Sequence, residues 1–240
     1  MTERTLLEVD GLVKRFGGFT ALNRVSLHVK EGERFGLIGP NGSGKTTLIN
    51  CVSGSLRADE GRIRFAGVDV TALPPHRRTH LGIARSFQIP KPFRSMTVLE
   101  NLGIPLEYAG HARAHDGRDE AREILRDIGL EEKAHLRPAG LTQIEMRKLE
   151  LARAMAARPK LLISDEAMAG LSSAEVDDIL AILFRMNAAG ITIIMIEHIM
   201  RAVMRFSERI VVLDAGERIA EGTPEEIVKN PAVEKAYLGE

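Results

Sequence analysis

The sequence contains one cysteine, no tryptophan, and only two tyrosines and eight phenylalanines among its 240 residues. The single cysteine, Cys51, excludes a disulfide within the chain and favours a reducing compartment. No apolar run approaches the roughly 20 residues that a membrane-spanning helix needs. The first residues, Met1-Thr2-Glu3-Arg4, lack the hydrophobic segment of a signal peptide. We therefore expect the protein to work in the cytoplasm.

Neither sign of charge dominates, because 33 lysines and arginines balance 33 aspartates and glutamates. This balance provides no general attraction to nucleic acid, so we expect no nucleic-acid partner. A hydrophobic content of 44% and a charged content of 28% are ordinary for a folded globular protein. The length fits one large domain or two small lobes.

The rest of the chain is arranged around a glycine-rich segment that matches the phosphate-loop pattern G-x-x-x-x-G-K-[ST]. The segment reads Gly39-Pro40-Asn41-Gly42-Ser43-Gly44-Lys45-Thr46-Thr47. It follows a predicted buried strand at 33–38 and precedes a predicted helix that starts near residue 47, which is the context the motif needs. The alternative is a glycine-rich turn that binds nothing, but the Lys-Thr-Thr after the last glycine argues against it.

The physical chemistry of such a loop predicts nucleotide binding. Glycines let the backbone turn its N–H groups inward, and the following helix adds partial positive charge at its N-terminus. Lys45 is expected to reach the β- and γ-phosphates, and the Thr46 hydroxyl to hold Mg²⁺. We predict that all nine residues of the segment bind the nucleotide.

Hydrophobic periodicity predicts the remaining elements. We predict strands at residues 5–14, 22–30, 60–67, 82–88, 159–166 and 191–196, with a hairpin at 209–221. We predict helices at 97–109, 119–130, 142–157 and 173–188. Shorter helices are predicted after Pro74-Pro75, around Met200, and from Pro224 to the C-terminus. Strands followed by helices favour an α/β fold.

Three polar residues follow predicted buried strands. Asp165 and Glu166 are adjacent, and two such carboxylates are costly unless a cation or a reacting water uses them. P-loop enzymes place a metal-ordering aspartate at this position, and Glu166 is suited to activating water. His198 is placed to contact a γ-phosphate, although alone it would be interpreted as a helix-start histidine.

Two further features leave alternatives open. Phe16, in a glycine-rich turn, is either a stacking platform for a flat ring or a residue that packs on the sheet, and its spacing favours neither. The proline-broken segment 89–96 either folds against its own domain or docks a partner. His111 and His115 are four residues apart, but without a helix there we expect solvated loop histidines rather than a metal site.

These motifs, in this order, resemble the ATP-binding-cassette (ABC) ATPases over essentially the whole chain. The resemblance implies an ABC-type P-loop ATPase with a mixed core sheet, an antiparallel β layer and a helical lobe. The core lobe would comprise about 1–89 and 160–240, and the helical lobe about 90–159. The implied cofactors are ATP and Mg²⁺.

The resemblance also implies a role for each motif. Phe16 would stack on adenine, Gln88 would be the Q-loop glutamine, and Mg²⁺ would lie on Thr46, Gln88 and Asp165. Glu166 would be the catalytic base, with Lys45 and His198 stabilising charge on the phosphoryl group. The D-loop position falls at residues 169–172. The signature motif, which would contact ATP across a dimer, falls at Leu141, Thr142, Gln143, Ile144 and Glu145.

Four positions depart from the usual family pattern. Ile144 replaces the signature glycine and Glu145 the glutamine. Ala167 stands where a proline usually follows the catalytic glutamate, and Ser172 where the D-loop has aspartate. Ile144 matters most, because its bulk and its resistance to positive φ would hinder a backbone N–H from approaching the γ-phosphate.

A finer resemblance is to the ATPase subunits of branched-chain amino-acid uptake systems. The segments that carry it are 14–18, 168–171, 196–198 and 236–240. It implies an importer subunit at the inner face of the membrane, partnered by membrane permeases, by a second ABC ATPase (a paralogue or itself) and indirectly by a solute-binding protein. Alternatives are import of amides or other small polar organics, a cassette ATPase acting on ribosomes or DNA, and a small-molecule kinase.

Overall fold

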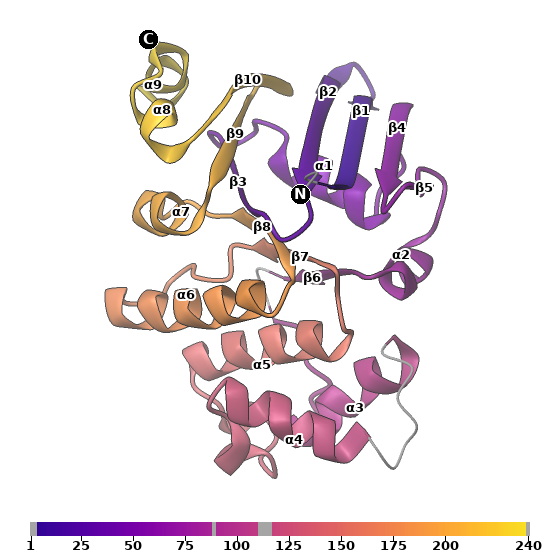
Figure 1. Ribbon diagram of the computed structural model, residues 1–240, viewed down its shortest axis with the longest axis vertical. Coiled ribbons are helices and arrows are strands. Elements are labelled where there is room, and N and C mark those ends of the chain that lie inside the picture. Colours follow the sequence, from indigo (N-terminus) through magenta and orange to yellow (C-terminus); the bar gives the residue numbers. More distant parts are fainter. Residues whose placement is uncertain (1–3, 88–89, 110–116, 239–240) are drawn as a thin grey trace.

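A computed structural model describes residues 4–87, 90–109 and 117–238 of the protein (Figure 1). It contains two β-sheets and a group of helices, as the α/β prediction requires. Among these residues, none of the helices combines the length and apolar character needed to cross a bilayer.

The central sheet has six strands in the order β10-β9-β3-β8-β7-β6. The strands are β3 (Arg34–Ile38), β6 (Ile83–Ser86), β7 (Leu161–Asp165), β8 (Thr192–Ile196), β9 (Arg209–Asp214) and β10 (Glu217–Gly222). All neighbouring pairs are parallel except β9 and β10, which form the predicted hairpin. Strands β7 and β8 are buried along their whole length, as expected for apolar runs covered on both faces.

The second sheet is antiparallel and has the order β2-β1-β4-β5. Its strands are β1 (Thr5–Phe16), β2 (Phe19–Lys30), β4 (Glu60–Phe65) and β5 (Val68–Asp69). Helix α1 (Lys45–Ser53) contributes Leu48, Ile49 and Val52 to a core shared with apolar residues of both sheets. The mixed sheet and the antiparallel layer are therefore both confirmed.

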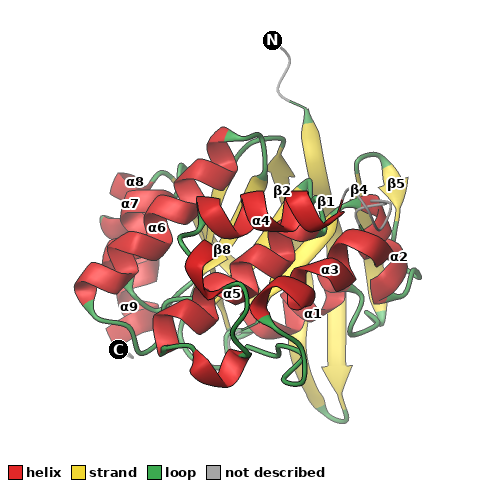
Figure 2. Ribbon diagram, turned by 90° about the horizontal axis from the view of Figure 1, so that it is seen from below, coloured by secondary structure: helices red, strands yellow, loops and turns green. Residues whose placement is uncertain are grey.

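A second core joins the other face of the central sheet to the helices. These are α3 (Val98–Tyr108), α4 (Gly117–Asp127), α5 (Gln143–Ala156), α6 (Ser173–Ala188), α7 (Met200–Phe206), α8 (Pro224–Val228) and α9 (Pro231–Leu238). Helix α2 (Pro75–Leu81) precedes β6. Seen from below, α3, α4 and α5 lie in front of the sheets (Figure 2). Met200 and Met204 pack against this core, as their helical spacing predicted.

Several predicted boundaries were wrong by a few residues. Strands β1 and β2 run up to the Gly17-Gly18 turn, so Phe16 and Phe19 belong to strands rather than to the turn. Helix α4 ends at Asp127 because Gly129 adopts a left-handed φ of 73°. The C-terminal helix is divided into α8 and α9 before Pro231. The two-residue strand β5 was not predicted.

Candidate functional site

The phosphate loop connects β3 to α1 through a backbone that only glycine can adopt. Gly44 is the N-cap of α1 with φ 101°, and a Cβ there would lie 2.7 Å from the Ala21 carbonyl oxygen. A Cβ at Gly39 would collide with the Leu213 carbonyl oxygen. Both glycines are therefore required by close backbone approach as well as by torsion.

Helix α1 presents its first-turn N–H groups to the loop cavity. The first intrahelical bond runs from the Leu48 N–H to the Gly44 carbonyl, at 2.9 Å. The N–H groups of Lys45, Thr46 and Thr47 precede it and have no acceptor within the helix. Together with the helix dipole, they form a site suited to phosphate oxygens.

Lys45 is almost completely buried, with 6% of its surface exposed. Its ammonium donates to the Gly39 carbonyl at 2.7 Å, the Pro40 carbonyl at 2.9 Å and Ser43 Oγ at 3.3 Å. Burial lowers the pKa of Lys45, and the nearby charges of Glu166 and Asp165 oppose that shift. A cation held in this cavity favours an anionic ligand.

The loop is braced from behind by the turn between β9 and β10. The Gly216 N–H donates to the Ser43 carbonyl at 3.1 Å, and the Gly216 carbonyl accepts from the Asn23 N–H at 2.8 Å. Segments from three distant parts of the sequence thus hold one another in place. No pattern along the sequence indicates this support, because Ser43 and Gly216 are far apart in the chain.

A cavity of about 280 Å³ lies against the phosphate loop. It is lined by Phe16, Phe19, Ala21, Glu166, His198 and every residue from Asn41 to Thr47. Phe16 is 50% exposed at this cavity, with the Lys14 ammonium 5.5 Å from its ring centroid. The ring is available for stacking rather than buried against the sheet, and its contact with adenine stays a prediction.

Glu166 and His198 are brought together from the ends of β7 and β8. The distance from His198 Nε2 to Glu166 Oε1 is 3.0 Å. Glu166 has φ 48°, an uncommon conformation for a non-glycine residue, and its N–H donates to the Ile196 carbonyl at 2.9 Å. That backbone bond fixes the main chain of Glu166, from which the carboxylate side chain extends. A carboxylate held beside an imidazole can accept a proton from water, which makes the water oxygen the nucleophile.

Asp165 contacts a cation that the sequence analysis missed. Arg85 Nη2 donates to Asp165 Oδ2 at 2.6 Å, and Arg85 Nη1 donates to Asn50 Oδ1 at 2.7 Å. The signal was present, because an arginine in an otherwise apolar strand needs a buried partner. Asp165 Oδ1 takes no part in the ion pair, so this oxygen and the Thr46 hydroxyl fit the hard oxygen ligands that Mg²⁺ prefers.

Glu197 is a second buried group that the sequence analysis did not assign. It is 3% exposed, and its Oε1 accepts from the Met168 N–H at 2.9 Å. Burial raises the pKa of Glu197 to about 7, and the Glu166 charge adds to this shift. The Met168 bond and the positive charge of Arg147 on α5 oppose the shift. Glu197 therefore links the segment after β8 to the segment after β7.

The signature residues lie at the start of α5. Thr142 is the N-cap, and a reciprocal capping box joins it to Glu145, whose carboxylate also pairs with Lys133 at 2.6 Å. Ile144 is helical, is not among the residues with positive φ, and packs against the core. The torsional part of our argument against Ile144 was therefore wrong, and only its bulk remains relevant. Ser172 likewise caps α6 through Glu175, which explains how serine serves at that position.

Some predicted residues lie outside the described part of the chain. These are Gln88, Ile89, His111, His115 and the last two residues of the C-terminal motif. The described residues do, however, bring together the phosphate loop, Asp165, Glu166 and His198.

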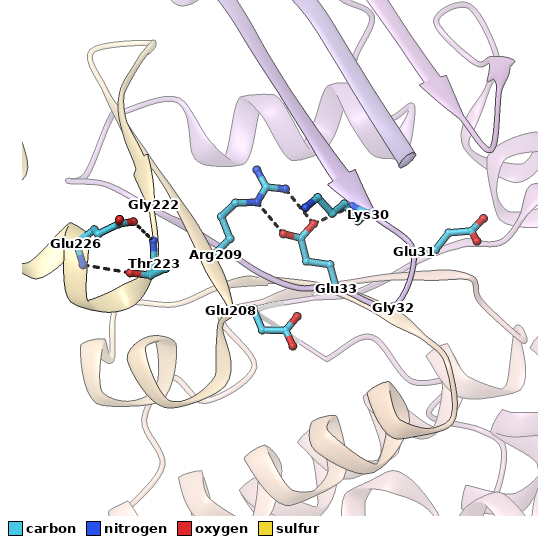
Figure 3. A pocket seen from close by; sticks show the side chains of 9 residues that line it. All are labelled: Lys30, Glu31, Gly32, Glu33, Glu208, Arg209, Gly222, Thr223 and Glu226. Carbon is cyan, nitrogen blue, oxygen red and sulfur yellow. Dashed lines mark hydrogen bonds and ion pairs between the residues drawn. The ribbon is translucent and has the colours of Figure 1, made fainter. Parts of the chain in front are cut away.

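A larger cavity, of about 520 Å³, lies near the starts of β3 and β9, at the end of β3 opposite to the phosphate loop (Figure 3). It is lined by residues that lead into β3 and β9 and by residues at the end of β10 and the start of α8, whereas the phosphate loop follows β3. Its charged groups already have partners: Arg209 Nε donates to Glu33 Oε1 at 2.7 Å, and Glu226 forms the capping box of α8. The charged groups that line this cavity therefore serve as structural ion pairs and helix caps.

Comparison with known proteins agrees with this geometry. The ABC transporter family model matches residues 22–169, and the model of the branched-chain amino acid ATP-binding cassette transporter matches residues 217–240. The chain is 39% identical over 252 residues to the high-affinity branched-chain amino acid transport ATP-binding protein BraF of Pseudomonas aeruginosa, covering 99% of both chains.

Solved structures show the same fold. A nucleotide-free ATP-binding cassette from an ABC transporter matches with a TM-score of 0.89 at 35% identity, covering 98% of this chain and 100% of that one. A cassette solved as a dimer with ADP and phosphate matches with a TM-score of 0.82 at 27% identity, covering 91% and 99%. Together, the site geometry and these similarities show that the chain belongs to the ABC transporter family, as an ATP-binding cassette ATPase.

Proposed function

We propose that this ATPase powers the import of branched-chain amino acids. The observation that supports the activity is the joining of the buried Lys45 loop with the Glu166–His198 pair at one cavity. The substrate class is supported by the family model that matches residues 217–240 and by the relative from Pseudomonas aeruginosa. Import of amides or other small polar organics remains the alternative substrate class.

The chain's own groups suggest the order of events. ATP would bind with its phosphates on the N–H groups at the start of α1, and Lys45 would exchange its loop carbonyls for phosphate oxygens. Mg²⁺, when bound through Thr46, Gln88 and Asp165, would neutralise charge on the phosphates. Glu166 would take a proton from the attacking water, and His198 would hold the Glu166 carboxylate in position. Phe16 would hold the base by stacking.

We also propose that the chain works as a dimer at the inner face of the membrane, bound to permease subunits and served indirectly by a solute-binding protein. Each ATP would lie between the phosphate loop of one chain and the start of α5 of its partner. A solved cassette that is dimeric and bound to ADP and phosphate supports the dimer. In this proposal residues 90–159 form the helical lobe.

The segment 90–96 is the proposed contact with the permease. Asn101, which is fully buried, accepts from the Phe93 N–H at 2.8 Å and donates to the Phe93 carbonyl at 3.1 Å. The Phe93 ring is 40% exposed and lies 5.1 Å from the Arg153 guanidinium. A cavity of about 500 Å³ between α3 and α4 borders the same segment at Ser95 and Met96. A held backbone with an exposed ring is typical of a docking surface.

Reconstitution tests the substrate class. The chain would be purified with its membrane partners and placed in vesicles, and uptake of labelled leucine, isoleucine and valine would be measured with ATP inside. We expect ATP-dependent uptake of these amino acids and little uptake of short amides. Uptake of amides alone would overturn the proposed substrate, and identifying the copurified second ATPase would decide between homodimer and heterodimer.

Phe93→Asp tests the docking surface. We expect normal ATPase activity of the isolated chain and loss of transport in vesicles, because a charge cannot enter an apolar interface without a partner. Val68→Asp, which changes a comparably exposed apolar residue on β5, is the control and should leave transport unchanged. Loss of folding in Phe93→Asp would show that the ring is part of the core.

A further inference from the structure

Arg85 joins three elements behind the phosphate-binding cavity. It lies on β6 and contacts Asp165 at the end of β7 and Asn50 on α1, the helix that begins with Lys45. These contacts are 2.6 Å to Asp165 Oδ2 and 2.7 Å to Asn50 Oδ1. The strand that carries the metal-ordering aspartate is thus tied to the helix that carries Thr46.

The ion pair is buried, with side chains of Arg85 and Asp165 only 11% and 9% exposed. Removing two charges from water costs several kcal/mol, so a buried pair contributes little to stability by itself. The Arg85 Nε is also buried and has no hydrogen-bond partner among the described residues. Such an arrangement is hard to explain by stability alone, because an apolar pair of similar size would pack at lower cost.

The contact uses only one of the two aspartate oxygens. Both the hydrogen bond and the ion pair of Arg85 are made to Oδ2, which leaves Oδ1 for another ligand. A planar guanidinium held at its other end by Asn50 also restricts rotation of the carboxylate. Partners of this kind, which hold a metal ligand without touching the metal, strongly affect metal affinity.

We propose that Arg85 is a positioning residue for Mg²⁺: anchored by Asn50, it holds Asp165 Oδ2 so that Oδ1 faces the metal on bound ATP. The inference rests on the Mg²⁺ site proposed above. It assigns Arg85 no contact with ATP or with the metal. Asn50 belongs to the same device, because without it the guanidinium has only one fixed end.

The test measures nucleotide binding rather than turnover. The dissociation constant of a fluorescent ATP analogue is measured once with EDTA and once with Mg²⁺. The ratio of the constant in EDTA to the constant in Mg²⁺ gives the factor by which the metal strengthens nucleotide binding. Arg85→Lys keeps the charge but cannot reach both Asp165 and Asn50, and Asn50→Leu removes the anchor alone. We expect about a tenfold or greater fall of the ratio in Arg85→Lys and a smaller fall in Asn50→Leu. The constant in EDTA should stay within about twofold of the parent, because neither change alters the charge.

The chain offers a matched control at the other end of the central sheet. Arg34 on β3 pairs with Glu208 at 2.8 Å and with Asn187 at 3.2 Å, so Arg34→Lys and Asn187→Leu repeat the same chemistry away from the cavity. Both should leave the ratio unchanged. Thermal melting without nucleotide verifies that these four variants, and Arg85→Met, fold.

The outcomes separate the two proposals. If the parent protein shows no Mg²⁺-dependent strengthening, the proposed metal site fails. If the parent shows it and Arg85→Lys keeps it, the metal site stands and the role of Arg85 is overturned. A rise of the ratio in Arg85→Met would also overturn that role, because it would mean that Arg85 competes with Mg²⁺ for Asp165.

Discussion

The phosphate loop and the start of α5 are held by different means. Around Gly39 and Gly44 the backbone is constrained by close contact with other backbone atoms, and Lys45 is buried among carbonyl oxygens. At the start of α5, side chains hold the backbone through the Thr142–Glu145 capping box and the Lys133 ion pair. Gly39 and Gly44 therefore tolerate almost no substitution, whereas at the start of α5 one capping residue can replace another.

This difference explains why two of the four departures from the family pattern, Ile144 and Glu145, fall in the second region. A glycine with a carbonyl oxygen 2.7 Å from its missing Cβ cannot be exchanged without moving the loop. At the start of α5, Ile144 is accommodated in helical geometry with its side chain against the core. We therefore expect the half-site of Lys45, Asp165, Glu166 and His198 to be catalytically competent, and the half-site of Ile144 to be the weaker one.

The sharpest test of the competent half-site is Glu166→Gln. We expect turnover to fall by at least ~100-fold while ATP still binds, because the amide keeps the shape of the side chain but cannot accept the proton from water. The ATP-bound dimer should persist longer. Steady-state ATPase assays and gel filtration with ATP measure both effects.

Glu175→Gln is the matched control, since Glu175 caps α6 and an amide can still accept at that position. It should leave turnover unchanged. Normal turnover in Glu166→Gln would mean that another group activates the water.

The link between the segments that follow β7 and β8 is tested through Glu197. Its pKa in the folded chain, about 7, is raised above the ordinary 4.5, so its contribution to stability is fully present below pH 4.5 and is lost as the pH rises through 7. Glu197→Gln removes this dependence and still offers an oxygen to the Met168 N–H. Relative to the parent, its free energy of unfolding should therefore rise between about pH 5 and pH 8, by up to ~3 kcal/mol.

Urea unfolding at several pH values measures this change. Glu145→Gln should change the pH dependence of the free energy of unfolding in the opposite direction, because the Lys133 hydrogen bond lowers the pKa of Glu145. Its stabilising contribution is present above the ordinary pKa and is lost as the pH falls through the lowered one. If the free energies of unfolding of Glu197→Gln and the parent differ by the same amount at every pH, the pKa of Glu197 is not raised in the folded chain.

Phe16→Ala tests whether the nucleotide is held at its base as well as at its phosphates. We expect nucleotide binding to weaken by about 1–3 kcal/mol, the usual range for loss of base stacking on an aromatic ring. Phe16→Tyr and Phe16→Trp should bind almost normally. A nucleotide titration that shows no loss in Phe16→Ala would assign the ring to packing instead.

The smallest expected effect concerns the weaker half-site. We expect the isolated chain to hydrolyse ATP weakly and with little cooperativity, and Ile144→Gly to raise the rate severalfold by letting a backbone donor reach the γ-phosphate. In a heterodimer whose partner keeps glycine there, Glu166→Gln in this chain should reduce activity more than the matching change in the partner. Strong cooperative hydrolysis by the homodimer, unchanged by Ile144→Gly, would remove the reason to expect asymmetry.

Local sequence alone was enough to predict the phosphate loop and the buried strands. Lys45 and Thr46 follow a glycine pattern with a single structural context. Runs such as 191–196 are apolar on both faces and so predict a central strand. These features depend on neighbours within a few residues, which the sequence lists in order.

Only the tertiary structure decided which distant groups meet. Arg85 and Asp165 are 80 residues apart, and they pair because β6 and β7 are parallel neighbours, with Ser86 opposite Ser164 just before Asp165. Met168 and Glu197 meet because β7 and β8 end at the same edge of the sheet. Strand order places these residues together and burial then forces their charges to find partners, and neither strand order nor burial can be derived from spacing along the chain.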